Sequence, residues 1–273
     1  MGDRIGIIAG SGEFPYLALE EAQKRGYTCV VAGIEHEADI GLKDKADEFD
    51  WIKGGDILKL VSFFKRNRIQ KVLLAGKVDY RRIFHKDKLK KPVRSLLNKT
   101  KEKRPAAIIG AIINYMNGEG IEVIDPTSFL APYLCREGIM TEAELSPEIR
   151  EDVDFGLKIA RKIADLDIGQ TVVVKNEAVV AVEGVEGTDE AIRRGGELAG
   201  EGVVVAKVGR SSQDIRVDLP GVGLSTIITL VEARGKALCI EAGKVLFLQQ
   251  EDAISLANEN KILVMAKNIS HIK

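Results

Sequence analysis

The sequence has 273 residues, of which 45% are hydrophobic and 30% are charged, a balance typical of a soluble globular protein. This length exceeds that of a usual single domain, so we expect two domains. Its 40 Lys and Arg side chains face 41 Asp and Glu side chains, which gives a formal net charge of −1. Because no global positive field results, we expect no nonspecific nucleic-acid binding.

Cysteine usage and hydropathy indicate the compartment. Cys29, Cys135 and Cys239 are far apart and form no CxxC pair, which argues against a zinc site and against a disulfide framework. The N-terminus lacks a signal-peptide pattern, and the longest apolar run, residues 106–113, is far shorter than the roughly 20 residues that cross a bilayer. We predict a cytoplasmic protein, and leave open both peripheral contact with the inner membrane face and homo-oligomerisation.

The chain begins with a glycine turn between a strand and a helix. Residues 4–9 predict a short buried strand, Gly10, Ser11 and Gly12 follow it, and an amphipathic helix comes next. Glycines let the backbone approach a ligand, and the helix N-terminus offers N–H groups to phosphate. Pro15 occupies the place of the third glycine of the full dinucleotide fingerprint, so a simple tight connection is the alternative interpretation.

Strands and helices alternate through the rest of the N-terminal half. We expect strands at residues 27–33, 45–52, 71–75 and 121–124, with helices at 57–67 and 106–116. This alternation predicts a Rossmann-like parallel sheet over residues 1–130. Lys77 follows the strand at 71–75 and would lie at the same sheet edge as the glycine turn, either as a phosphate contact or as a solvated lysine.

Residues 79–104 are strongly basic and also contain regularly spaced apolar side chains. Such a run usually marks a solvated face. The alternative is an amphipathic element that contacts anionic lipid or an anionic substrate.

Residues 131–147 predict a linker, and residues 148–273 a mixed α/β domain that carries the catalytic motifs. We expect a helix at 148–166, a hairpin at 171–183 around Asn176 and Glu177, and a helix at 190–199 capped by Thr188 or Asp189. A strand at 203–208, a helix or strand at 225–232, strands at 237–240 and 245–248, a helix at 251–258 and a strand at 262–266 should follow.

Two charged segments in this half are candidate sites. Glu183, Glu186 and Asp189 surround two glycines at a strand-to-helix turn, and their oxygen atoms suit magnesium or calcium better than zinc. Residues 207–223 contain Arg210, Asp214, Arg216 and Asp218. Carboxylates there would hold a cation and arginines an anionic substrate, although a solvated loop with surface ion pairs gives the same composition.

Five motifs together resemble one family. They are Ala-Gly-Ser-Gly-Glu-Phe-Pro at 9–15, Ala-Gly-Lys-Val at 75–78, Asp-Ile-Gly-Gln at 167–170, Glu-Gly-Thr-Asp at 186–189, and Gln-Asp-Ile-Arg-Val-Asp-Leu-Pro at 213–220 with Gly223. In this order, the sequence resembles the LpxI-type UDP-2,3-diacylglucosamine pyrophosphatases over nearly its whole length.

The resemblance implies a Mg²⁺-dependent hydrolase of lipid A biosynthesis, which cleaves its lipid nucleotide substrate to UMP and 2,3-diacylglucosamine 1-phosphate. It also implies two α/β domains that bind the lipid product between them. Asp214 and Asp218 would hold the cation or accept the proton of water, with Glu186 and Asp189 as further metal ligands. Charge on the phosphoryl oxygens would be stabilised by Lys207, Arg210 and Arg216. The substrate would be contacted by Gly10, Ser11, Gly12, Lys77, Gln170, Thr188, Arg210 and Gln213.

Two departures from the family pattern keep alternatives open. Residues 106–110 contain no Asp or Glu where the family has an acidic pair, and Arg210 replaces a lysine. The alternatives are a nucleotide-sugar binding protein without hydrolysis and a related pyrophosphatase with a different substrate. The basic segment at 79–104 motivates a third, a non-enzymatic adaptor at the membrane surface.

Overall fold

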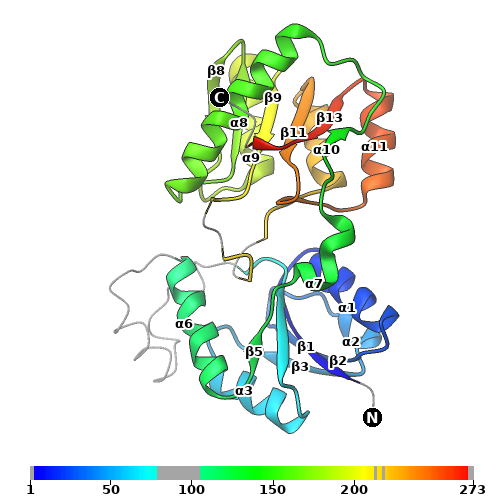
Figure 1. Ribbon diagram of the computed structural model, residues 1–273, viewed down its shortest axis with the longest axis vertical. Helices are drawn as coiled ribbons and strands as arrows, with labels where there is room; N and C mark the ends of the chain where they lie inside the picture. Colours follow the sequence, from blue (N-terminus) through cyan, green and yellow to red (C-terminus); the bar gives the residue numbers. More distant parts are fainter. Residues whose placement is uncertain (1–2, 79–104, 212–213, 217–218, 270–273) are drawn as a thin grey trace. The chain divides into compact units, whose positions relative to one another are not determined.

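The computed structural model describes residues 3–78, 105–211, 214–216 and 219–269. Over these ranges, no helix is both long and apolar enough to cross a membrane. The chain divides into two compact units, whose helices and strands are labelled in Figure 1. One unit comprises Met1–Ala131 and Asp214–Asp218, and the other comprises Pro132–Gln213 and Leu219–Lys273. The predicted basic segment at 79–104 lies outside the described residues.

The first unit contains a five-stranded sheet in which every pairing is parallel, in the order β3-β2-β1-β4-β5. This confirms the predicted Rossmann-like arrangement. The elements are β1 (Arg4–Ala9), α1 (Phe14–Lys24), β2 (Thr28–Ile34), α2 (Leu42–Lys45), β3 (Glu48–Ile52), α3 (Ile57–Arg66), β4 (Lys71–Ala75), α6 (Pro105–Gly118), β5 (Glu122–Val123) and α7 (Thr127–Leu130).

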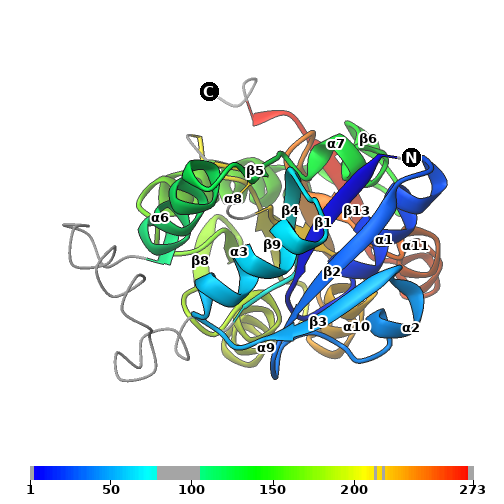
Figure 2. The same cartoon turned by 90° about the horizontal axis from the view of Figure 1, so that it is seen from below.

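Helices cover both faces of this sheet, which explains why β1 and β2 are apolar almost throughout. Figure 2 shows α3 and α6 on one face and α1 and α2 on the other. Phe64 of α3 and Met116 of α6 are fully buried in one cluster with Val30 and Val72 of the strands. The glycine turn and Lys77 both lie at the carboxyl edge of this sheet, after β1 and β4.

The second unit contains a six-stranded mixed sheet, in the order β6-β13-β11-β9-β7-β8, and a two-stranded parallel sheet of β10 and β12. Its elements are η2 (Ala131–Tyr133), which begins at the unit boundary, β6 (Gly138–Ile139), α8 (Pro147–Asp165), β7 (Thr171–Lys175), β8 (Ala178–Val182), α9 (Thr188–Ala199), β9 (Val204–Lys207), β10 (Gly221–Val222), α10 (Leu224–Glu232), β11 (Ala237–Glu241), β12 (Leu246–Phe247), α11 (Gln250–Glu259) and β13 (Leu263–Lys267).

Alternating side chains of the central strands divide the second core into two layers. Val204 and Ala206 of β9 belong to the cluster that contains Leu157 of α8. Val205 points to the other face and belongs to the cluster that contains Ile192 of α9 and Ile227 of α10. Successive residues of a strand point to opposite faces, so one apolar run supplies both layers.

The predicted hairpin around Asn176 and Glu177 is present, and both residues have positive φ, at 51° and 55°. The buried carboxylate of Asp152 on α8 accepts the backbone N–H groups of Asn176 at 3.1 Å and of Glu177 at 2.6 Å. The turn is therefore fixed to the helix below it.

Two local expectations change, and one open alternative is decided. The segment predicted as a linker, residues 131–147, contains η2 and β6, and β6 pairs with β13 of the second sheet. Residues 224–232 form a helix, which is one of the two alternatives expected for residues 225–232. The N-cap of α9 is Gly187, with φ 90°, and neither Thr188 nor Asp189 caps the helix, because the helix begins at Thr188 itself.

Candidate functional site

Two turns interlock at the carboxyl edge of the first sheet. The backbone N–H of Ser11 donates to Lys77 O at 2.7 Å, and that of Lys77 donates to Ser11 O at 3.0 Å. The Ser11 hydroxyl also donates to Lys77 O, at 3.0 Å. Predicted substrate-binding residues from β1 and β4 are thus brought together.

The interlock requires glycine at two positions. A Cβ at Gly10 would lie 2.3 Å from Lys77 O, and one at Gly76, where φ is 91°, would lie 2.5 Å from Ser11 O. Gly12 has the same φ of 91°, but it differs in that a Cβ built there would meet only open space. The edge beside Gly12 therefore leaves room for a ligand next to the first turn of α1.

In the second unit, Lys207 ends β9 with its side chain almost completely buried, at 6% exposure. Its Nζ donates to Thr188 Oγ1 at 2.6 Å and to Thr171 Oγ1 at 3.1 Å, and lies 3.8 Å from Glu183 Oε2. Because Thr171 and Lys207 are register partners in β7 and β9, the sheet itself places them together. Lys207 and Thr188, predicted from two separate motifs, thus belong to one polar cluster.

Glu183 is the counter-charge of this cluster. Its Oε1 accepts from Thr188 Oγ1 at 2.9 Å and its Oε2 from the backbone N–H of Gln170 at 3.0 Å. Burial alone would raise the pKa of Glu183, but the charge of Lys207 and hydrogen bonds from Thr171, Gln170 and Thr188 lower it below its usual value. Glu183 is therefore ionised at neutral pH.

Glu186, a predicted metal ligand, is engaged on the α9 turn. Its Oε1 accepts from Arg194 at 2.7 Å, and its Oε2 accepts the backbone N–H of Gly184 at 3.1 Å. A hydrogen bond from the backbone N–H of Glu186 itself, together with the hydrogen bonds and charge of Arg194 and the Gly184 N–H, outweighs burial and lowers the pKa of Glu186. Asp189 follows Thr188 in the first turn of α9 and is partly buried.

The loop after β9 is held by α8 and β11. The buried carboxylate of Glu241 at the end of β11 accepts the backbone N–H of Gly209 at 3.0 Å, and Arg161 of α8 donates to Gly209 O at 2.5 Å. Arg161 and Glu241 also pair directly. Arg210, predicted to bind substrate, forms an ion pair with Asp167 at 2.8 Å.

Ser211 completes this attachment. Its backbone N–H and its hydroxyl donate to the two carboxylate oxygens of Asp165, at 2.7 and 2.8 Å. Burial raises the pKa of Asp165, but these two hydrogen bonds and the nearby Arg161 outweigh that effect and lower it.

Asp214 and Arg216 form a forked pair, with Nε to Oδ1 at 2.9 Å and Nη2 to Oδ2 at 2.7 Å. The Arg216 guanidinium holds the pKa of the Asp214 carboxyl below its usual value, and both side chains remain substantially exposed, at 42% for Asp214 and 37% for Arg216. Gln213 and Asp218, the other predicted residues of this motif, lie outside the described residues.

The predicted magnesium ligands are Asp214, Asp218, Glu186 and Asp189, and their arrangement can be compared with the oxygen ligands that Mg²⁺ usually binds. Across the described ranges, no group of three or more His, Cys, Asp or Glu side chains is arranged to hold a metal ion. Mg²⁺ usually takes only one or two protein carboxylates, together with waters and substrate phosphate oxygens. Asp214 fits that limited role through Oδ2, which accepts one hydrogen bond from Arg216 and keeps a second lone pair, whereas Oδ1 accepts both the backbone N–H and Nε of Arg216.

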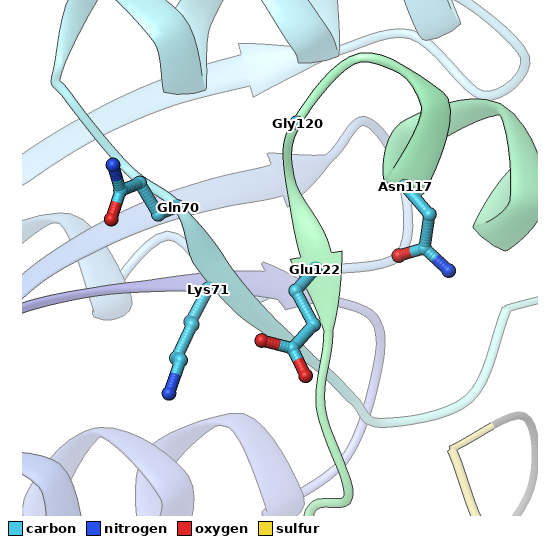
Figure 3. Close-up of a pocket in the computed structure, with 5 residues that line it drawn as sticks. All are labelled: Gln70, Lys71, Asn117, Gly120 and Glu122. Atoms are coloured by element: carbon cyan, nitrogen blue, oxygen red, sulfur yellow. The ribbon is translucent and has the colours of Figure 1, made fainter.

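A depression of about 450 Å³, lined by Gln70, Lys71, Asn117, Gly120 and Glu122, lies elsewhere on the first unit. Figure 3 shows these side chains around the starts of β4 and β5, where Lys71 and Glu122 are register partners. The amino edge of a parallel sheet is opposite to the edge where its ligands usually bind. The depression is therefore separate from the glycine turn.

Three charged residues of these networks, Arg161, Asp165 and Glu241, were not predicted as site residues from the sequence. Glu183 was predicted as a candidate cation ligand and not as the partner of Lys207. Glu241 ends an apolar strand and Arg161 lies on the apolar face of a helix, positions where a charge needs a partner. That mismatch was the available signal, but the partners are distant in sequence.

Comparison with known proteins covers nearly the whole chain. The family models named LpxI N-terminal domain and LpxI C-terminal domain match residues 4–133 and 136–265. A curated relative, the UDP-2,3-diacylglucosamine pyrophosphatase LpxI of Caulobacter vibrioides, is 28% identical over 274 aligned positions, which cover 96% of each chain.

Solved structures give a much weaker likeness. A biotin carboxylase complex from Campylobacter jejuni has 12% identity and a TM-score of 0.30 over 73% of this chain and 42% of its own. A glycinamide-RNase-transformylase T from Mycobacterium tuberculosis has 12% identity and a TM-score of 0.28 over 66% and 44%. This chain thus spans less than half of each of these longer chains, and TM-scores this low support no argument.

Proposed function

The chain belongs to the LpxI family, and from that membership we propose that it hydrolyses the pyrophosphate bond of UDP-2,3-diacylglucosamine to give UMP and 2,3-diacylglucosamine 1-phosphate. The observation that carries the proposal is the curated relative, which aligns over 96% of both chains and so includes both units. The five sequence motifs indicate the same family.

The reaction adds one water across one P–O–P bond. The water oxygen bonds to a phosphorus atom, the bridging P–O bond breaks, and the proton of the water passes to a carboxylate. When bound, Mg²⁺ neutralises pyrophosphate charge and lowers the pKa of a coordinated water.

We assign different roles to the two aspartates of the loop. Arg216 keeps the pKa of Asp214 low, so Asp214 is a poor proton acceptor at neutral pH and is better suited to hold a cation. Asp218 then accepts the proton. Arg216 and Arg210 stabilise charge on the phosphoryl oxygens, as cations placed near developing negative charge do.

The remaining predicted contacts divide between the units. Gly12, with open space at its Cβ position, and Ser11 and Lys77 beside it take the phosphate or ribose part of the substrate. Thr188, Gln170 and Lys207 order the turn before α9, and Glu186 and Asp189 are secondary candidates for cation contact. Contact with the membrane surface, where the lipid substrate resides, belongs to the same proposal.

A product-release panel tests the function. Purified protein is incubated with UDP-2,3-diacylglucosamine, UDP-N-acetylglucosamine or a simple dinucleotide, each with Mg²⁺ or with EDTA, and the nucleoside monophosphate released is quantified. We expect UMP from the diacylated substrate only, and only with Mg²⁺. Nucleoside monophosphate from all three substrates would indicate a general pyrophosphatase. Tight binding without UMP would indicate a nucleotide-sugar binding protein and would overturn the proposal.

A further inference from the structure

We propose that Glu35, at the carboxyl end of β2, binds the ribose hydroxyls of the substrate nucleotide, whose phosphate lies at the glycine turn. This inference rests on the proposed function for the identity of the nucleotide, but the ribose contact can be tested by binding alone. Glu35 lies in the first unit, as do the glycine turn and α1, and it is outside the five motifs by which the family resemblance was drawn.

The side chain of Glu35 lies on the face of the first sheet that α1 covers. The backbone N–H of Glu35 donates to Ile52 O of β3 at 2.9 Å, so the hydrogen-bond ladder of β2 continues one residue beyond Ile34. On the same strand, Cys29 Sγ contacts Leu19 O of α1, whereas Ile34 belongs to the cluster on the α3 face. Because successive residues of a strand point to opposite faces, Glu35 shares the face of Cys29, which is the face of α1 and α2 in Figure 2.

The loop after β2 is tied to the first turn of α1. Tyr16 of α1 donates its hydroxyl hydrogen to Asp39 Oδ1 at 2.8 Å, and the same oxygen accepts the backbone N–H of Gly41 at 2.6 Å. The loop therefore packs beside the start of α1, which closely follows Gly12 in the chain. Glu35 and the open space at Gly12 thus lie at the same edge and on the same face of the first sheet.

Glu35 differs from Asp39 in its hydrogen bonding. Asp39 is exposed and accepts from two groups of the protein, as described above. The side chain of Glu35 is half-buried, and within the part of the chain that the structure describes no hydrogen bond or ion pair engages its carboxylate. Burial of a carboxylate without donors costs free energy, which a ligand that supplies donors recovers. Glu35 is therefore suited to accept hydrogen bonds from a ligand.

A ribose 5′-phosphate matches the two features. Phosphate suits the backbone N–H groups at the start of α1 beside Gly12, while the negative charge of Glu35 repels a phosphate and favours hydroxyl donors. Neighbouring strands lie about 5 Å apart, so the two positions are separated by about 5–10 Å. In the nucleotide, C5′ and C4′ span that gap, and the adjacent 2′- and 3′-hydroxyls can both donate to one carboxylate. A carboxylate at the end of the second strand has this role in other sheets with a glycine turn after the first strand.

Binding of UMP and of 2′-deoxy-UMP to the full chain, measured by isothermal titration calorimetry, tests the contact without hydrolysis. We expect the wild type to bind UMP about tenfold more tightly, which corresponds to the loss of one hydrogen bond to a charged group. Glu35→Gln should reduce this ratio to less than about threefold, with weaker binding of UMP. Its binding of 2′-deoxy-UMP should stay the same or become tighter, because the substitution also removes a negative charge near the phosphate.

Glu48→Gln is the matched control. Glu48 is an exposed carboxylate at the start of β3, which is the opposite, amino edge of the same sheet. The control should keep the wild-type ratio of the two affinities, and both variants should keep the wild-type melting temperature, because neither carboxylate is in the core.

Equal affinities of the wild type for UMP and 2′-deoxy-UMP, or no binding of UMP at millimolar concentration, would overturn the inference. It would also be overturned if Glu35→Gln kept the wild-type ratio, or if Glu48→Gln lost that ratio to the same extent. A wild type that prefers UMP but releases none from UDP-2,3-diacylglucosamine would overturn the proposed function only. A wild type that releases UMP but binds the two nucleotides equally would overturn the ribose contact only.

Discussion

Asp214 is the residue on which the proposed chemistry depends most directly among those described. Its side chain is substantially exposed, and its only described side-chain partner is Arg216 in the same loop. Exposed residues outside the core usually tolerate substitution with little loss of stability. Activity and stability should therefore separate cleanly at this position.

We expect Asp214→Ala to lower kcat by about 10²–10⁴-fold while the melting temperature stays close to that of the wild type. Initial rates of UMP release and differential scanning calorimetry give the two quantities. Glu190→Gln is the control, because Glu190 is also an exposed partner of an arginine but lies on α9 outside the proposed machinery. Near-wild-type hydrolysis by Asp214→Ala would refute the mechanism.

Glu183 gives a prediction about pH. Because its folded pKa lies below its ordinary value of 4.5, its contribution to stability is present above that value and is lost as pH falls through the folded pKa. In Glu183→Gln the buried Lys207 loses its counter-charge, so we expect a loss of about 3 kcal/mol in the free energy of unfolding at pH 7. Urea titrations from pH 7 to pH 3 should show the two proteins converging at the acid end, and a constant difference would contradict this assignment.

At the scale of elements, the interlocked turns of the first sheet depend on backbone that carries no side chain. Gly10 and Gly76 let two turns exchange hydrogen bonds across the ends of β1 and β4. Neither neighbour can retreat easily, because the atoms that a Cβ would meet are backbone oxygens. The backbone of the two strand ends therefore fixes the shape of the sheet edge that is the candidate substrate-binding region.

We expect Gly10→Ala to lower the free energy of unfolding by about 1–3 kcal/mol or more, because its Cβ would clash with Lys77 O. Gly110→Ala is the matched control. Gly110 lies in α6 with open space at its Cβ position, so alanine there should be neutral or stabilising by up to about 1 kcal/mol. Chemical denaturation of both variants measures the contrast, and equal stability of the two would count against the interlock.

The elements themselves were largely predictable from the sequence. The strands at Arg4–Ala9 and Lys71–Ala75 have the predicted bounds, and Thr171–Lys175 begins where the predicted hairpin begins, because short apolar runs ended by glycine or polar residues leave little freedom. The hairpin at Asn176 and Glu177 follows from two apolar runs separated by two polar residues, of which Asn176 readily accepts positive φ and Glu177 does not. The N-cap of α9 could not be predicted in the same way, because the Thr188 hydroxyl that would cap a helix bonds Glu183 and Lys207 instead.

The site was less predictable than the fold. Lys207 and Thr188 were predicted from two separate motifs, but their hydrogen bond depends on the register of β7 and β9 and on the turn that begins α9. Arg161 and Glu241 were missed because they are joined by an ion pair across 80 residues of chain. The spacing of apolar residues in the sequence predicts which face of a helix or strand is buried. Which charged residues pair across the edge of a sheet depends on the assembled fold.

At the scale of the whole molecule, charge is nearly balanced, but its distribution along the sequence is uneven. The net charge is −1, yet residues 79–104 contain a large excess of Lys and Arg. Such a segment gains about 1 kcal/mol per basic residue near an anionic membrane, and the gain weakens as salt screens it. The lipid nature of the proposed substrate makes this contact useful.

We therefore expect the protein to sediment with phosphatidylglycerol vesicles at low ionic strength and much less at 0.5 M NaCl. Changing Lys88, Lys90 and Lys91 to Gln should weaken binding, while Lys43 and Lys45 changed to Gln, outside this segment, should not. Binding that persists in high salt, or that ignores the three lysines, would show that charge in this segment does not drive the contact.

The short strand β6 determines where the chain could be cut to give a fragment that contains the second unit. Before it, Cys135 donates to Val245 O and accepts from Gly243; within it, Ile139 pairs with Met265 of β13; after it, Val264 donates to Thr141 Oγ1. A recombinant fragment that starts at Pro147 would leave one border of the second sheet bare and prone to self-association. A fragment that starts at Pro132 would keep that border covered, which places the recombination point for swapping domains between relatives at the short 3-10 turn and not at the start of the long helix.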